Sequence, residues 1–199
     1  MPGLCRPFRC FVGLPLPEPW QAGLSRVTQR LAAVLASRIS WTRPGNGHVT
    51  LKFLGDVDAA QVPAVVEALR AVSFAPFTLA VGQAGSFPPV GPSGGKASPR
   101  ALWAGLARGA EDCARLAAAV ERALAPLGFA AEARGFNAHL TLGRVKAAAP
   151  GDDWAEVERA VAGEAWPEAG ISRFVLWRSM LGADGPRYAA LAEFPARPG

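Results

Sequence analysis

Two segments of the chain alternate strictly between hydrophobic and polar positions, which is the pattern of a strand buried on one face. The first runs from His48 to Leu54 and the second from His139 to Val145. Each begins with the same motif, His-x-Thr-Leu, so histidine and threonine share one face of the strand, about 7 Å apart. The apolar residues between them are expected to face the core.

The remaining pattern predicts helices where apolar residues recur every three or four positions and strands where they alternate. One face of the first helix carries four apolar residues, namely Leu24, Val27, Leu31 and Leu35. In chain order the other expected elements are a strand at Phe8 to Leu16, a helix at Trp20 to Ser37, a short strand at Ile39 to Arg43, a helix at Ala59 to Val72, strands at Phe77 to Gln83 and Ala101 to Leu106, a helix at Glu111 to Leu127, a strand at Phe129 to Arg134, a helix from Asp152 or Asp153 to Ala162, and strands at Ile171 to Leu181 and Tyr188 to Phe194.

This order of elements repeats once along the chain, with one His-x-Thr strand in each copy. Two copies are too few for a solenoid, but they can form two lobes related by a pseudo-twofold axis. We therefore expect one domain over residues 1–199, made of two interleaved lobes with repeats at about 18–106 and 110–194. The equivalent strands of the two lobes are expected to face a shared cleft.

Composition narrows the class of protein. Half of the residues are hydrophobic and 19% are charged, as in a folded globular chain. The absence of an apolar run near 20 residues, and of a signal peptide, predicts a cytoplasmic protein without a membrane span. Cys5, Cys10 and Cys113 fit no zinc spacing and are interpreted as free thiols. The net charge of +5 favours a polyanionic partner, with nucleic acid first.

The paired motifs suit the opening of a cyclic phosphodiester. One imidazole can take a proton from water while the other protonates the leaving ribose oxygen on the far side of phosphorus. Histidine suits both roles because its ordinary pKa lies near 6.5. The threonine hydroxyls can donate hydrogen bonds to the non-bridging oxygens of the phosphate.

The alternative is that these are ordinary strand residues, since threonine is simply a good β-former. That interpretation has to explain why both of the only two histidines begin the same motif in matching copies of a repeat. The catalytic interpretation is therefore favoured.

The chain resembles the two-histidine phosphoesterases, and within them the bacterial and archaeal RNA 2′,3′-cyclic phosphodiesterases, once called 2′-5′ RNA ligases (LigT-like). The resemblance covers nearly the whole chain. It rests on five segments: Arg9 to Pro17, His48 to Val57, Ala101 to Leu106, Phe136 to Val145 and Leu181 to Phe194.

The resemblance implies an α+β, bilobal, duplicated fold with two antiparallel sheets and outer helices around a central cleft. It implies an enzyme that opens RNA 2′,3′-cyclic phosphate ends to 2′-phosphates, and in some members joins or cleaves 2′-5′ linkages without ATP. By resemblance His48 is the proton donor and His139 the proton acceptor, whereas Thr50, Thr141 and Arg144 bind the substrate phosphate. The two motifs are near mirror images, so the residues themselves do not decide which histidine is the acid.

Two basic residues need a structural test. Strict alternation puts Arg144 on the face opposite His139, so Arg144 reaches the cleft only if the strand carries a bulge or ends there. Lys52 alternates in phase with His48, which allows either a cleft-lining or a surface lysine.

No cofactor and no metal are expected. A catalytic zinc site normally takes three protein ligands, and two histidines in separate repeats, with no carboxylate in either motif, do not supply them. The expected partner is RNA with a 2′,3′-cyclic phosphate end, tRNA fragments among the candidates, and the expected oligomeric state is a monomer.

The sequence also contains partial matches to the motifs of two other enzyme classes. The stretch Gly91 to Lys96 imitates a nucleophile elbow and a P-loop, but surrounding prolines and the missing Ser or Thr after the lysine argue against both.

Two rival functions are considered. One is a two-histidine enzyme acting on small cyclic nucleotides or 2′-5′ oligonucleotides. The other is an RNA-binding relative that performs no chemistry, although such a relative would be expected to lose a histidine or threonine.

Overall fold

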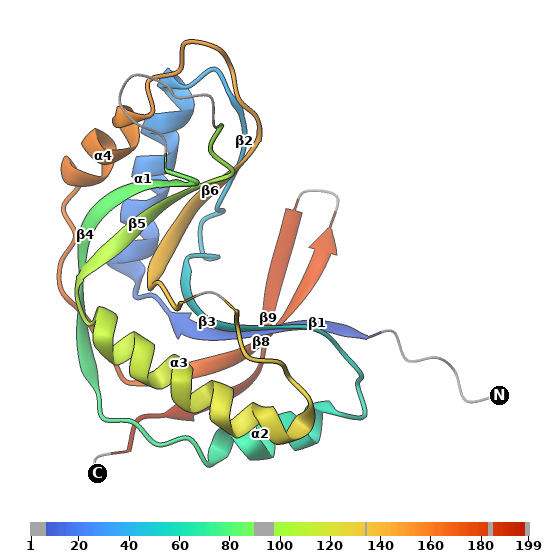
Figure 1. The fold of residues 1–199 in the computed structure, drawn as a ribbon. Helices are drawn as coiled ribbons and strands as arrows, with labels where there is room; N and C mark the ends of the chain where they lie inside the picture. Colours follow the sequence, from blue (N-terminus) through green and yellow to red (C-terminus); the bar gives the residue numbers. More distant parts are fainter. Residues whose placement is uncertain (1–6, 90–97, 134, 183–184, 198–199) are drawn as a thin grey trace.

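The structure is a computed structural model that describes residues 7–89, 98–133, 135–182 and 185–197. Within these residues four α-helices surround a curled sheet (Figure 1). The strands are β1 (Phe8–Pro15), β2 (Arg38–Trp41), β3 (His48–Val57), β4 (Phe77–Phe87), β5 (Ala101–Arg108), β6 (His139–Ala147), β7 (Ala169–Ile171), β8 (Arg173–Gly182) and β9 (Gly185–Pro195). The helices are α1 (Glu18–Val34), α2 (Val62–Arg70), α3 (Ala110–Leu124) and α4 (Ala155–Ala162), and a 3₁₀ turn, η1, covers Ala125–Leu127.

The sheet is antiparallel throughout and runs in the spatial order β7-β4-β5-β6-β3-β1-β8-β9, with β2 attached to β6. At its centre β3 and β6 are paired at Val49 and Leu140. Two half-sheets therefore meet at a short seam, and both His-x-Thr strands border it. The predicted α+β class with two antiparallel sheets is confirmed, with the two sheets joined into one curled path.

Each half-sheet takes a strand from the other half of the sequence. β8, near the end of the chain, pairs with β1, whereas β4, from the first half, pairs with β5. The helices also pack in pairs drawn from both halves, α1 with α4 and α2 with α3.

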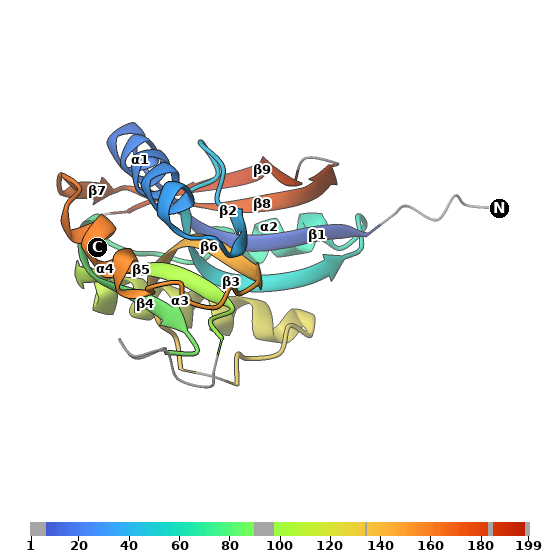
Figure 2. The same ribbon diagram turned by 90° about the horizontal axis from the view of Figure 1, so that it is seen from above.

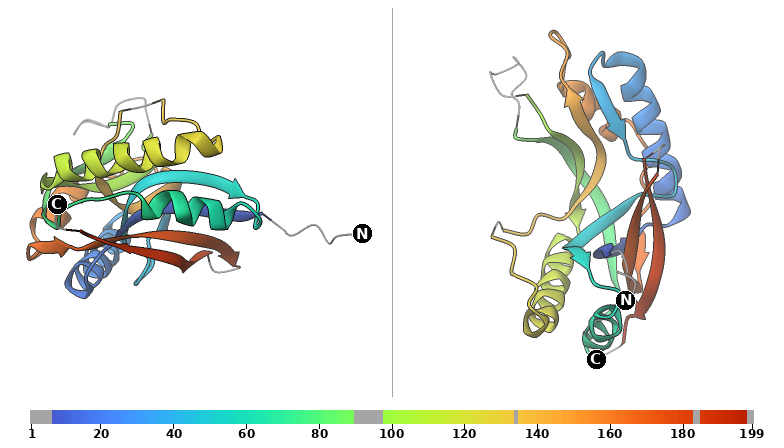
Figure 3. Two further views of the ribbon diagram at one scale, coloured as in Figure 1. Left: turned by 90° about the horizontal axis from the view of Figure 1, so that it is seen from below. Right: turned by 90° about the vertical axis from the view of Figure 1, so that its right-hand side faces the viewer.

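The helices leave one side of the sheet open. Seen from above, the strands lie between α1 on one side and α3 on the other (Figure 2). From below, α2 and α3 lie side by side, and the right-hand view of Figure 3 looks onto β3, β6 and β9 with no helix in front of them. No helix covers that face of β3 and β6 in this view.

The core forms where the periodicity predicts it. The four apolar residues of the first helix face are all buried, as are the residues that alternate with the site positions on β3 and β6: Leu24, Val27, Leu31, Leu35, Val49, Leu51, Leu140 and Leu142. Cys10 and Cys113 are free and buried, as expected. Cys5 and the stretch at 91–96 lie outside the described residues.

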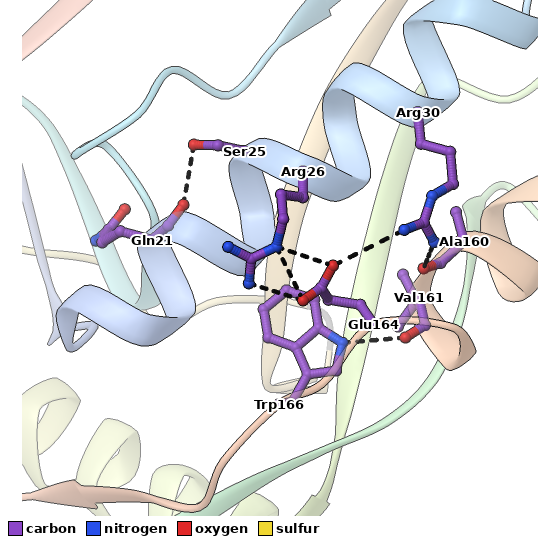
Figure 4. Close-up of polar contacts among 8 residues, drawn as sticks. All are labelled: Gln21, Ser25, Arg26, Arg30, Ala160, Val161, Glu164 and Trp166. Carbon is purple, nitrogen blue, oxygen red and sulfur yellow. Dashed lines mark hydrogen bonds and ion pairs between the residues drawn. The ribbon is translucent and has the colours of Figure 1, made fainter.

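Helices α1 and α4 are fastened by a close contact and by charge. The ring of Trp166 lies so near Gly23 that an added Cβ would meet it at 2.9 Å, so a larger residue would displace α1. The carboxylate of Glu164, 6% exposed, binds Arg26 at 2.8 Å and Arg30 at 4.0 Å (Figure 4).

Neighbouring aspartates end one helix and begin another. Asp153 accepts the backbone N–H of Ala155, the first residue of α4, whereas the N-cap position itself is Trp154, which makes no side-chain capping bond. Asp152 instead accepts the N–H groups of Ala36 and Ser37, just past the end of α1. This contact explains why the first helix ends before the predicted Ser37.

Strand β3 carries a bulge directly after its threonine. Gly13 of β1 pairs with Thr50, but the next residue back, Val12, pairs with Lys52, so Leu51 is an extra residue. A bulge of this kind shifts the alternation by one position. Lys52 therefore points into the protein and is 2% exposed.

Strand β6 carries the matching bulge. Trp103 of β5 pairs with Thr141, whereas Leu102 pairs with Gly143, so Leu142 is the extra residue. The sequence of partly buried, buried and exposed positions from the histidine onward is the same in both strands. The repeat recognised in the sequence therefore extends to the irregularity of the backbone.

Buried Lys52 corrects two predictions. It lines neither the cleft nor the surface, because its Nζ donates to Glu121 Oε1 at 3.1 Å and to the Ala130 carbonyl at 2.7 Å. Glu121 also accepts the N–H of Glu132 at 3.0 Å. The predicted strand at Phe129 to Arg134 is wrong for its described residues, which form a loop, because side chains satisfy these backbone groups. Residue 134 itself is not described.

This contact predicts that Lys52→Ala lowers the free energy of unfolding by about 2–3 kcal/mol, because it leaves Ala130 and part of Glu121 without a donor. Lys52→Met keeps the apolar stem and should lose about 1–2 kcal/mol. Urea denaturation measures both, with Arg70→Gln as a control for an exposed pair worth under about 0.5 kcal/mol. Equal stability of Lys52→Ala and the control would contradict the role given to this lysine.

Candidate active site

The seam between the half-sheets brings the two predicted histidines to one place. His48 and His139 each begin a strand and immediately precede the paired residues Val49 and Leu140. Antiparallel register then sets each histidine across from the threonine of the other strand. Because Val49 and Leu140 point into the core, all four polar side chains lie on the opposite, open face. Thr50 and Thr141 are both partly buried there.

Backbone carbonyls fix both imidazole rings in the same way. Nδ1 of His48 lies 2.8 Å from the carbonyl oxygen of Asn46, and Nδ1 of His139 lies 2.8 Å from that of Asn137. A carbonyl only accepts, so each Nδ1 carries the proton and each Nε2 of the neutral ring has a free lone pair. The spacing Asn-x-His occurs twice in the sequence and is a signal that the sequence analysis missed.

Aromatic rings surround His48. The centroid of the Phe11 ring lies 4.7 Å from that of the imidazole, and the Tyr188 ring packs edge-to-face on the imidazole with a centroid distance of 5.3 Å. Trp177 completes the group at 5.8 Å. These residues come from β1, β8 and β9, so sequence spacing could not associate them with the histidine.

His139 has a smaller aromatic group of its own. Phe87 meets the imidazole edge-on at 5.4 Å and stacks on Trp103 at 5.1 Å. Gly105, the cross-strand neighbour of His139, has no side chain, and a Cβ there would meet the Trp103 ring at 3.0 Å. The missing side chain is what lets this indole lie beside the site.

The surroundings keep both imidazoles neutral. Burial lowers the pKa of His48 to about 4, with smaller effects of the positive charges of His139 and Arg144 and an opposing hydrogen bond to Asn46. Burial also lowers the pKa of His139, and Arg144 adds to this effect. At neutral pH the free protein therefore presents two uncharged bases.

Arg144 reaches the open face because of the bulge. The extra residue Leu142 restores Arg144 to the side of His139 and Thr141, which strict alternation would forbid. Its charge acts on both imidazoles, and it partly opposes the burial that raises the pKa of Tyr188. In β3 the equivalent position is Phe53, whose side chain is 54% exposed.

Metal-binding groups were sought in the same part of the chain. Across residues 7–89, 98–133, 135–182 and 185–197, no three His, Cys, Asp or Glu side chains are close enough together to hold a metal ion.

The four helices described include none long and apolar enough to cross a membrane.

Comparison with known proteins identifies the family. The model of the LigT-like phosphoesterases matches residues 14–96 and 106–188, and each matched range contains one His-x-Thr strand. The chain belongs to the LigT-like phosphoesterase family.

Curated relatives of this LigT-like protein align over most of its length. A protein of Archaeoglobus fulgidus is 33% identical over 186 residues, which is 94% of this chain and 99% of the relative. A protein of Aquifex aeolicus is 30% identical over 191 residues, 94% of this chain and 96% of the relative. Both relatives are named RNA 2′,3′-cyclic phosphodiesterase.

Solved structures show the same fold. A protein of Thermus thermophilus superimposes with a TM-score of 0.76 at 26% identity, covering 95% of this chain and 98% of the other. Escherichia coli LigT in complex with 3′-AMP superimposes with a TM-score of 0.69 at 23% identity, covering 96% and 98%. The fold expected from the resemblance is therefore confirmed for this LigT-like chain.

The neutral imidazoles lead to a prediction for NMR, which the presence of only two histidines makes simple. We expect ¹H–¹⁵N spectra to show the proton on Nδ1 of both rings at pH 7, and His48 to titrate near pH 4. Unfolded histidine titrates near 6.5. The stabilisation from keeping His48 neutral is therefore complete above pH 6.5 and is lost as pH falls toward 4.

The same titration has a consequence for stability. Between about pH 6.5 and 4, the free energy of unfolding should fall less steeply in His48→Gln than in the parent chain, by up to about 3 kcal/mol. Urea denaturation at several pH values measures this slope. A His48 midpoint at or above 6.5, or identical slopes for the two chains, would contradict the electrostatic account.

Proposed function

We propose that this protein hydrolyses 2′,3′-cyclic phosphate ends of RNA to 2′-phosphates by acid–base catalysis with two histidines. The observation that carries the proposal is the pair of imidazoles, His48 and His139, held alike through Nδ1 with both Nε2 atoms free beside the seam. The relatives named RNA 2′,3′-cyclic phosphodiesterase, aligned over 94% of the chain, support this substrate.

In the proposed reaction, His139 Nε2 takes a proton from water while the water oxygen attacks phosphorus. The bond from phosphorus to the 3′ oxygen breaks, and His48 Nε2 delivers a proton to that oxygen. The phosphate stays on the 2′ oxygen. With a 5′ hydroxyl in place of water as the nucleophile, the same steps would join a 2′-5′ linkage without ATP, because the bond to the 3′ oxygen breaks as the new bond to phosphorus forms. The assignment of donor and acceptor rests on the family resemblance.

The acid role requires His48 to gain a proton when substrate binds. Burial and the charges of Arg144 and His139 hold the pKa of His48 near 4 in the free protein. A phosphate anion beside Nε2 favours the charged ring and raises this pKa. Substrate binding and protonation of the acid are therefore coupled in the proposed mechanism.

The phosphate is proposed to bind between the two strands. Thr50 and Thr141 share the open face with the histidines, and each can donate a hydrogen bond to a non-bridging oxygen. Arg144, brought to this face by the bulge, supplies a guanidinium that suits an anion geometrically. Donors aimed at the oxygens where charge develops lower the barrier in the way an oxyanion hole does.

The proposal extends to organisation and setting. The chain would act as a single domain over residues 1–199 with repeats at about 18–106 and 110–194, which agrees with the strands exchanged between its halves. Both histidines belong to one chain, so a monomer would suffice. The substrates would be cytoplasmic RNA fragments, tRNA fragments among them, and neither a metal nor a cofactor would take part.

Removal of either imidazole tests the proposal. We expect His48→Ala and His139→Ala each to lower kcat on a cyclic-phosphate oligonucleotide by at least about 10²–10⁴-fold. The double variant should lose little beyond the worse single variant, because the two groups act as a unit. Circular dichroism checks folding, and near-parental turnover by either folded variant would refute the assignment.

A substrate with an activated leaving group separates acid from base. Bis(p-nitrophenyl) phosphate releases a weakly basic phenolate that needs no protonation. His48→Ala should therefore retain most of the parental rate on this substrate, whereas His139→Ala should not. The opposite result would exchange the two roles and leave the site itself intact.

A further inference from the structure

The basic side chains of the described residues differ in their partners. Several on the helices and near strand ends have a carboxylate within 4.0 Å: Arg26, Arg30, Arg70, Arg108, Arg115, Arg159 and Arg173. Among the residues described, Arg100, Arg144 and Lys146 have no carboxylate this close, and the same is true of Arg9, Arg38, Arg43, Arg122, Arg178 and Arg197. Unpaired cations gathered at one place leave a positive field that attracts anions.

Two of these cations line a cavity. It has a volume of about 410 Å³ and lies where the start of β5 meets the end of β6, with Arg100 and Lys146 on its wall. Ser98 adds a hydroxyl, and the lining contains no acidic side chain. The strands are tied together here, since the Val145 N–H donates to the Arg100 carbonyl at 3.0 Å. This hydrogen bond holds together the two segments that carry Arg100 and Lys146.

The cavity lies on a line that starts at the histidines. Along the open face of β6 come His139, Thr141 and, after the bulge, Arg144. Lys146 follows at the cavity, where a second bulge makes it an extra residue opposite Arg38 and Ile39 of β2. At about 3.3 Å per residue, Lys146 lies on the order of 15 Å from Thr141. A terminal nucleotide whose phosphate sits at Thr141 does not extend that far along the strand.

We propose that this cavity binds a backbone phosphate of the RNA upstream of the cyclic end, so that the enzyme selects oligonucleotides over cyclic mononucleotides. The inference rests on the proposed function. An RNA strand is the occupant that presents anions at intervals along one path, and it would pass Arg144 before it reaches Arg100 and Lys146. Ser98 can in addition donate to a phosphate or ribose oxygen.

Turnover on substrates of increasing length tests the site. We compare the cyclic mononucleotide with cyclic-phosphate oligonucleotides of two to five residues, using the parent chain, Arg100→Gln, Lys146→Gln, the double variant Arg100→Gln/Lys146→Gln, and Arg115→Gln on α3 as the control for each loss of a single charge. The kcat/KM of the parent should rise with the length of the substrate. From the mononucleotide to the pentanucleotide, this increase should be at least about tenfold smaller in the double variant. Its log–log salt slope should be smaller by about 1. Arg115→Gln should follow the parent.

A binding experiment keeps the inference separate from catalysis. Fluorescence anisotropy with a pentanucleotide ending in a 2′-phosphate needs no turnover. Replacing one upstream phosphate at a time with an uncharged methylphosphonate should weaken binding to the parent at one position and have no effect there on the double variant. The position-specific effect could be present in the parent and lost in the double variant while the parent hydrolyses no substrate. That outcome would refute the proposed function and still support the cavity as a site for RNA.

Three results would overturn the inference. The first is a double variant that follows the parent at every length and at every methylphosphonate position. The second is a loss as large for the cyclic mononucleotide as for the pentanucleotide, which would make the two cations part of the catalytic phosphate site. The third is binding of inorganic phosphate at Arg100 and Lys146 together with no effect of RNA length on turnover. The cavity would then be a site for a free anion and not for the RNA strand.

Discussion

The matched bulges after Thr50 and Thr141 are the constraint on which the site depends. In an unbroken strand, alternate residues stay on one face, so a third functional side chain would have to follow the threonine by two positions. The extra leucine in each strand moves that position by one. On β6 this puts Arg144 beside the histidine, whereas on β3 it sends Lys52 into the core. The bulge is the same in both strands, so the two halves of the site differ through the residues that it places on the open face, Arg144 on β6 and Phe53 on β3.

The protonation state of the two imidazoles is the second feature on which the site depends. A pair of histidines packed among aromatic rings and near an arginine is kept uncharged at neutral pH in the free protein. Fixed carbonyls determine which nitrogen carries the proton, so each ring meets the substrate with the same atom. Such a site would respond to a phosphodiester by gaining both a ligand and a proton. Specificity for charge and readiness for acid catalysis would then have a common cause.

The sequence predicts much of this arrangement because its signals are local. Alternation placed each histidine and its threonine on one face, and the repeated motif suggested that the two strands meet. Prediction from the sequence failed where contacts between residues far apart in the chain decide the structure. Lys52 is buried by a bulge and a carboxylate on α3, and the loop after α3 remains a loop because that same pair binds it. The aromatic rings around His48 come from three strands far apart in the chain.

The most direct test of the central claim is phosphorus NMR of the product formed from an RNA oligonucleotide with a 2′,3′-cyclic phosphate end, with EDTA present throughout. The account predicts complete conversion to the 2′-phosphate by the parent chain and none by His139→Ala in the same time. A 3′-phosphate as the main product would contradict the order of proton transfers. A reaction abolished by EDTA and restored by zinc or magnesium would contradict catalysis by two imidazoles alone.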